Sequence, residues 1–143
     1  MTYSVAPAAE TGFDRLSPRT HLLLLVLFTA LIYVGSAWSP SLQDDADAAH
    51  AEAAREMVER GDWVTLHING IRYLEKAPLL YWAVAASYKL FGFTEFGTRL
   101  PLALGAILLV GEVYVFGRWM AGARDGFYAG LEVASGLGVY LFC

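Results

Sequence analysis

Residues 21–38 read HLLLLVLFTALIYVGSAW, an uncharged run close to the length of a membrane-crossing helix. A helix needs about 20 mainly apolar residues to cross the roughly 30 Å hydrocarbon core of a bilayer. The chain as a whole is also apolar: 57% of its 143 residues are hydrophobic, 17% are charged and the mean hydropathy is +0.45. Soluble domains are roughly 45–50% apolar and about 25% charged. The sequence therefore predicts a helical membrane protein.

Three further apolar segments follow, at about residues 77–93, 100–120 and 127–143. Together with the first segment they predict an all-α fold of about four transmembrane helices. The short connection at residues 92–98 contains two glycines, so the second and third helices are expected to form an antiparallel hairpin. The last segment stops at Cys143 with no polar residue after it, and we expect the protein to continue beyond this chain.

The positive charges before the first segment set its expected orientation. Arg15 and Arg19 favour a cytoplasmic tail at residues 1–20, which places the loop at residues 39–76 on the outer side. Two arginines between the third and fourth segments oppose this orientation. A cleaved signal peptide is the alternative for the first segment, since small residues at 35–37 resemble a cleavage site. The membrane prediction survives either way, because three apolar segments follow.

The loop at residues 39–76 carries most of the acidic residues and predicts a helix followed by a hairpin. Aspartates at 44–45 can cap the helix and Gly61 can end it, while Glu56 and Arg60 are spaced as an i,i+4 ion pair. One face carries small apolar side chains: Ala46, Ala49, Ala53, Ala54, Met57 and Val58. We expect this face to lie on the membrane or against the spans.

Asn69-Gly70 separates two β-prone runs, residues 63–68 and 71–74. An Asn-Gly pair between such runs is the strongest short-range signal for a β-hairpin. The loop is therefore expected to end in a small two-stranded flap. Glu75 and Lys76 follow it and stand directly before the second apolar segment.

Charge and cysteine content exclude some functions. The formal net charge is −4, and no cluster of basic residues stands out, so a nucleic-acid partner is not expected. Cys143 is the single cysteine, which excludes a disulfide within this chain.

Antiparallel packing of the first two apolar helices would bring the acids at 44–47 and the Glu75-Lys76 pair to one membrane face. A carboxylate there can act as a general base or bind a divalent cation. Lys76 and Arg72 can neutralise a phosphate at headgroup depth. The ordinary explanation is that the acids cap a helix and the basic residues anchor a span at the interface.

Other ionisable residues offer weaker signals. His50 lies three residues after Asp47, a spacing that can hold a metal, although two ligands are weak evidence. His67 has no such neighbour and is expected to be an ordinary loop or strand residue. Glu112 and Glu132 fall inside apolar segments, where ionisable residues are costly and usually functional. They suggest an alternative function, a non-enzymatic membrane module such as a transporter half or an assembly subunit.

Four blocks of the loop occur in the order and spacing of a known family: AEAAREM at 51–57, GDWVT at 61–65, Asn69-Gly70, and YLEKAPLLYW at 73–82. They resemble the lipid A aminoarabinose transferase and protein O-mannosyltransferase family. The members are polytopic GT-C glycosyltransferases that use a polyprenyl-phosphate sugar donor. The resemblance implies a multi-pass protein of the bacterial cytoplasmic (inner) membrane, with residues 21–143 as the N-terminal part of a GT-C-type transmembrane domain.

The resemblance also implies roles for individual residues. In an inverting transfer, an acid of the first external loop assists the acceptor. Asp45 and Asp47 compete for that role, because an alanine stands where an ungapped match places the family's aspartate. Lys76 would contact the leaving phosphate, and Glu75 would lie at the donor or at a divalent metal site. The implied substrate-binding residues are Arg72, Tyr73, Glu75 and Lys76.

The leading hypothesis is therefore a fragment of a membrane glycosyltransferase. It would move a sugar from a polyprenyl-phosphate carrier to a lipid or protein acceptor while embedded among membrane lipids. Relatives implied by the resemblance are several times longer, so this chain alone is expected to hold an incomplete site.

Overall fold

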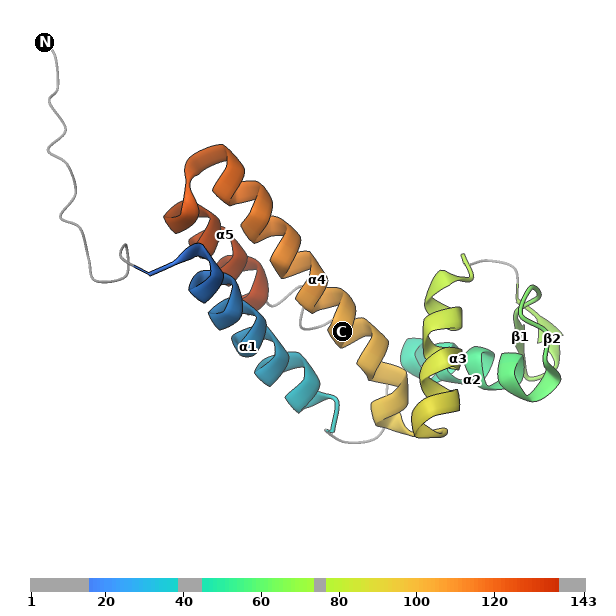
Figure 1. The fold of residues 1–143 in the computed structure, drawn as a ribbon. Helices are drawn as coiled ribbons and strands as arrows, with labels where there is room; N and C mark the ends of the chain where they lie inside the picture. Colours follow the sequence, from blue (N-terminus) through green and yellow to red (C-terminus); the bar gives the residue numbers. More distant parts are fainter. Residues whose placement is uncertain (1–15, 39–44, 74–76, 137–143) are drawn as a thin grey trace, which may run out of the picture.

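The computed structural model describes residues 16–38, 45–73 and 77–136, and within these it describes no side chain at residues 45–47. The described residues form five helices and a two-stranded sheet (Figure 1). In chain order these are α1 (Pro18–Ser36), α2 (Asp45–Arg60), β1 (His67–Ile68), β2 (Ile71–Arg72), α3 (Leu79–Phe91), α4 (Glu95–Ala121) and α5 (Ala123–Ser135). The predicted all-α membrane fold with a small hairpin is confirmed.

α1 and α4 are the helices of the described residues that are long and apolar enough to cross a membrane. α1 begins where Ser17 Oγ accepts a hydrogen bond from the Thr20 N–H at 3.2 Å, with Pro18 in its first turn. The two helices run antiparallel. The Tyr114 hydroxyl of α4 donates to the Pro18 carbonyl at 2.8 Å, and at the other end the Trp38 and Phe96 rings lie 4.6 Å apart.

α5 packs against both long helices and completes a three-helix bundle (Figure 1). Its approach to α4 depends on glycine, because a Cβ added at Gly126 would lie 2.6 Å from the Arg118 nitrogen and 2.7 Å from the Tyr114 oxygen. Small residues let membrane helices approach closely in this way. On the other side, the Tyr33 hydroxyl of α1 donates to the Ala134 carbonyl at 3.2 Å.

α2, α3 and the hairpin form a second unit beside the start of α4 (Figure 1). The predicted small-sided face of α2 is confirmed, because Ala53, Ala54 and Met57 are buried against α3. The buried residues that complete this core are Leu66, Tyr81, Val84, Ala85 and Tyr88. The face packs against another helix, so this part of α2 is covered by protein.

Two of the predicted spans differ from the structure in length. The second, predicted at residues 77–93, forms the 13-residue α3, which at 1.5 Å per residue is about 20 Å long and too short to cross a bilayer. Pro78 caps its start, and Gly92 ends it with a φ of 77°. The fourth, predicted at residues 127–143, begins earlier as α5, which ends at Ser135, and residues 137–143 lie outside the described residues.

The expected hairpin of the second and third spans is present as a reversal of the chain. α3 ends at Phe91, and α4 begins at Glu95 after Thr94, whose hydroxyl accepts from the Gly97 N–H at 3.0 Å. The two helices diverge from this turn (Figure 1), and an apolar groove of about 400 Å³ lies between them.

Candidate active site

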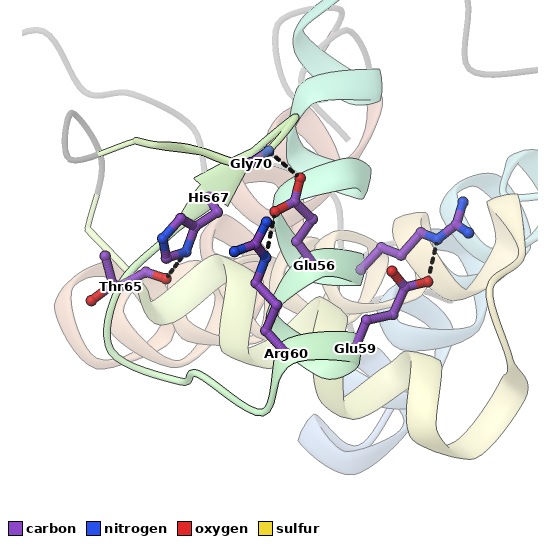
Figure 2. Close-up of polar contacts among 7 residues, drawn as sticks. Glu56, Glu59, Arg60, Thr65, His67 and Gly70 are labelled. Atoms are coloured by element: carbon purple, nitrogen blue, oxygen red, sulfur yellow. Dashed lines mark hydrogen bonds and ion pairs between the residues drawn. The ribbon is translucent and has the colours of Figure 1, made fainter.

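Glu56 ties the hairpin to α2 (Figure 2). One carboxylate oxygen accepts the Gly70 N–H at 2.8 Å, and the other pairs with Arg60 Nε at 2.9 Å. Glu56 is 8% exposed, so both contacts are shielded from solvent on the glutamate side. The sequence predicted the ion pair with Arg60 but not the contact with the hairpin, which joins residues fourteen positions apart. Glu56 thus positions the flap relative to the helix that carries the candidate acids.

The hairpin has the geometry that its sequence predicted. His67 pairs with Arg72 and Ile68 with Ile71, and both turn residues have positive φ, 53° at Asn69 and 78° at Gly70. Positive φ at both central residues is typical of a type I′ turn, whose twist matches that of the strands. His67 is an ordinary strand residue, as expected, with its Nδ1 2.9 Å from the Thr65 carbonyl oxygen (Figure 2).

Asp62 shapes the connection between α2 and β1. One of its carboxylate oxygens accepts the N–H groups of Val64 and Thr65, each at 3.0 Å. Both hydrogen bonds favour the ionised form, so they hold the pKa of the Asp62 carboxyl below its ordinary value. Asp62 is therefore ionised at neutral pH, and its carboxylate stabilises the turn after α2.

Trp63 links the connection after α2 to α3. Its carbonyl accepts the Trp82 indole N–H at 2.7 Å, and the Lys89 ammonium lies 4.4 Å from the centre of its ring. Lys89 lies in the last turn of α3. The connection after α2 is thus fastened to two turns of α3.

The predicted substrate-binding residues fall at the end of the flap. Arg72 is exposed on β2, and the Tyr73 N–H donates to the Leu66 carbonyl at 2.8 Å while its side chain packs half-buried against the core of the unit. Burial raises the pKa of the neighbouring Tyr81 hydroxyl, and Tyr73 adds to the effect. Glu75 and Lys76 lie outside the described residues, so the structure does not test their predicted roles.

Asp45 and Asp47 lie in the first turn of α2, although their side chains are outside what is described. His50 follows within the next turn, and its ring packs against Tyr81 of α3 with 5.4 Å between centroids. This contact places the first half of α2 against the start of α3, the helix that Glu75 and Lys76 precede. Among the described residues, no three His, Cys, Asp or Glu side chains gather as a metal site.

A pocket that the sequence did not suggest lies where α2 meets the turn between α3 and α4. Its volume is about 270 Å³, and its polar lining includes Glu52, Arg55, Tyr88, Glu95 and Thr98. The Tyr88 hydroxyl lies 2.7 Å from Thr98 Oγ1, and burial raises the tyrosine's pKa. Arg55 Nε forms an ion pair with Glu59 at 2.8 Å. These residues come from three helices, and no local pattern joins them.

Glu112 and Glu132 are both exposed on the outside of the three-helix bundle. The hydroxyl of the nearby Ser135 donates to the backbone carbonyls of Leu131 and Glu132 and not to the Glu132 carboxylate. The two glutamates come from different helices and do not share a cavity, since Glu112 lines a groove between α1 and α4 to which Glu132 does not contribute.

Comparison with known proteins gives matches in sequence and in structure. The undecaprenyl phosphate-alpha-4-amino-4-deoxy-L-arabinose arabinosyl transferase of Yersinia enterocolitica is 41% identical over 98 residues, which are 68% of this chain and 17% of the relative. The Aeromonas salmonicida transferase of the same name is 38% identical over 125 residues, 81% of this chain and 21% of the relative. No family model matches. The chain is thus similar in sequence to part of these arabinosyl transferases.

The folds agree as well. The crystal structure of ArnT from Cupriavidus metallidurans in the apo state matches 82% of this chain and 22% of that protein, with 34% identity and a TM-score of 0.72. The same protein bound to undecaprenyl phosphate matches 87% of this chain and 24% of its own length, with 28% identity and a TM-score of 0.74. The GT-C resemblance is confirmed, and this chain spans about one fifth of the length of the proteins it matches.

Proposed function

We propose that the chain forms part of a membrane glycosyltransferase that takes a sugar from a polyprenyl-phosphate carrier. The donor class is supported by the relatives' names and by a matching structure that holds undecaprenyl phosphate. The names favour an amino-arabinose sugar, and we propose a lipid such as lipid A as the acceptor, with protein as the second choice. The bacterial inner membrane is the proposed location, with residues 1–20 inside and residues 39–76 at the outer face.

The proposed site lies where α2 meets the end of the flap and the start of α3. Asp45 or Asp47 is the proposed catalytic carboxylate. The proposed substrate-binding residues are Arg72, Tyr73, Glu75 and Lys76, and Glu75 could also bind a divalent metal. The observation that carries this assignment is the contact of His50 with Tyr81, because it brings the acid-bearing end of α2 to the helix that follows Glu75 and Lys76. Glu56 holds the flap against the last turns of α2.

The chemistry asked of these residues is a single displacement. The aspartate accepts the proton of the acceptor hydroxyl, whose oxygen attacks the anomeric carbon as the bond to the carrier phosphate breaks. One displacement from the opposite face inverts the anomeric centre. The phosphate leaves with the bonding electrons, and Lys76 and Arg72 stabilise its charge. Transfer therefore depends on one carboxylate and on positive charge at the phosphate.

A chimera tests the proposal. The segment of Cupriavidus metallidurans ArnT that aligns with this chain is replaced by the matching residues of this chain, and lipid A modification is measured by mass spectrometry in cells that lack their own transferase. A chimera carrying the Yersinia segment is the control for segment exchange. We expect sugar transfer from both chimeras. Transfer by the Yersinia chimera alone, with both inserted in the membrane at equal levels, would contradict the proposed function.

The same chimera separates the two candidate acids. Asp45→Asn, Asp47→Asn and the double variant are compared with Glu59→Gln, a control that changes an exposed ion pair of α2. A lost general base typically costs about 10²- to 10⁴-fold in rate. We expect one aspartate variant and the double variant to lose transfer by that order, and the control to keep it. Full activity of the double variant would refute the acid assignment.

A further inference from the structure

The outer surface between α1 and α4 is hollowed into an apolar groove. Its volume is about 580 Å³, and it is lined by Leu22, Val26, Ile107, Leu108, Gly111, Glu112, Val115, Phe116 and Trp119. Its large side chains are uncovered, with Leu108 68% exposed and Trp119 80% exposed. α5 packs against the same two helices (Figure 1) but contributes no residue to the groove. Within the described residues, the groove is therefore an open side of the three-helix bundle.

Glu112 lines this groove well inside α4, which is long and apolar enough to cross a membrane. It lies nine residues before the end of α4 at Ala121, which is about 14 Å along the helix axis, and α4 continues for about 26 Å on its other side. Among the described residues, no hydrogen bond or ion pair reaches the Glu112 carboxylate. An ionisable side chain facing lipid at such a depth is costly, and in membrane proteins it faces protein or a water-filled cavity.

Gly111 makes room beside Glu112. A Cβ added there would meet no atom within 4 Å, so the glycine is not required by packing inside the described fold. Glycine at a membrane helix surface allows a second helix to approach closely, and polar side chains then hydrogen-bond across the contact. An apolar wall, a small residue and one acid within the apolar helix fit another helix better than lipid tails, which offer no donor to the carboxylate.

We propose that the α1/α4 groove receives a further membrane-spanning helix that presents a basic side chain to Glu112. The charge of Glu112 selects a basic residue such as lysine, because an acid paired with a cation satisfies both in a medium of low dielectric constant. A second copy of this chain fits less well, since a symmetric contact would bring two Glu112 carboxylates together. This interaction is separate from the proposed transfer chemistry and uses none of its residues.

The test uses the full chain in phosphatidylcholine vesicles, labelled with a donor fluorophore on its single cysteine. The probes are synthetic leucine-rich helices of about 20 residues that carry an acceptor fluorophore and differ at one central position, lysine, glutamate or leucine. Energy transfer measures association. We expect the lysine helix to bind at least about fivefold more tightly than the leucine helix, and the glutamate helix to bind weakest.

Matched variants locate the contact. Glu112→Gln should bring the lysine preference below about twofold, whereas Glu132→Gln, on an exposed position of α5, should leave it unchanged. Gly111→Leu should abolish binding of the lysine and leucine helices. Gly105→Leu is its control, because Gly105 has equal space but lines the groove between α3 and α4.

Equal binding of all three helices to the wild-type chain would overturn the proposal. Unchanged binding after Gly111→Leu would do the same. Energy transfer between two labelled copies that disappears in Gly111→Leu would assign the groove to a second copy and also overturn it. Circular dichroism of each variant confirms that loss of binding is not loss of the helices.

Discussion

The bundle of α1, α4 and α5 and the unit of α2, α3 and the hairpin achieve close packing by different means. In the bundle, glycines let backbones touch, and hydroxyl groups of Tyr33 and Tyr114 reach carbonyls about one hundred residues away. The second unit packs alanines and Met57 of α2 on α3, and Glu56 fastens its hairpin with charged hydrogen bonds. The bundle thus depends on shape at a few backbone contacts, whereas the loop unit depends on side-chain burial and polar anchors.

Gly126→Ala should have the largest effect within the bundle of α1, α4 and α5, because the new methyl group would collide with the backbone of α4 at Arg118 and Tyr114. Backbone atoms cannot change rotamer as a flexible side chain can, so α5 must move away from α4. Overpacking typically costs about 1–3 kcal/mol, and we expect the upper part of that range. Thermal unfolding in detergent measures the change.

Gly35→Ala is the control for this variant, since an added Cβ there meets no atom within 4 Å. It should be neutral, or slightly stabilising through better helix propensity. Equal destabilisation by both variants would show that glycine contributes through chain flexibility and not through the close contact of α4 and α5.

Met57→Ala tests whether the two regions unfold separately. Met57 is 2% exposed, and truncation of a buried methionine to alanine costs about 2–5 kcal/mol. We expect faster hydrogen exchange in α2 and the hairpin, with exchange in α4 and α5 unchanged. Val64→Ala, at a position that is 84% exposed, should change neither region. Faster exchange throughout the chain would instead show one cooperative unit.

Glu56→Ala and Glu59→Ala compare two i,i+4 pairs of the same helix. Loss of Glu56 removes the charged acceptor of the Gly70 N–H, and hydrogen bonds to charged groups contribute about 1.5–3 kcal/mol, whereas the exposed pair of Arg55 with Glu59 contributes little. The Gly70 amide should therefore exchange faster in the first variant alone. Equal protection of Gly70 in both would contradict the anchoring role of Glu56.

The smallest expected effect is a pH dependence at Asp62. Its folded-state pKa is lowered by two backbone N–H donors, so the stabilisation is fully present above the ordinary pKa of an aspartate and is lost as pH falls through the folded value. The amide resonances of Val64 and Thr65, followed by NMR, should shift over this acid range. Asp62→Asn should remove the transition, and its persistence would point to another acid.

Local signals predicted the loop unit well. The end of α2 at Gly61, the Glu56–Arg60 pair and the Asn69-Gly70 turn each depend on residues a few positions apart, so the sequence alone predicted them. The contact of Glu56 with Gly70 joins residues fourteen positions apart, and no periodic pattern indicates it. The packing of His50 on Tyr81 was missed for the same reason.

Hydropathy misjudged α3 for a physical reason. Its apolar residues, such as Tyr81 and Val84, are buried against α2, and an average over the sequence cannot tell burial in protein from exposure to lipid. The family resemblance predicted the fold and its relatives correctly. The choice between Asp45 and Asp47 stays a prediction, as do the roles of Glu75 and Lys76, because the deciding side chains lie outside those described.

The hydrogen bond from Tyr114 to Pro18 joins residues 96 positions apart, so during synthesis α1 is complete before its partner residue in α4 has been made. At about 5–20 residues per second, the ribosome delivers Tyr114 roughly 5–20 s after Pro18. For that interval the face of α1 that carries Leu25, Thr29 and Tyr33 has none of the α4 and α5 contacts that later bury it. The nascent α1 must therefore be covered by lipid or by the insertion machinery until α4 and α5 have been synthesised.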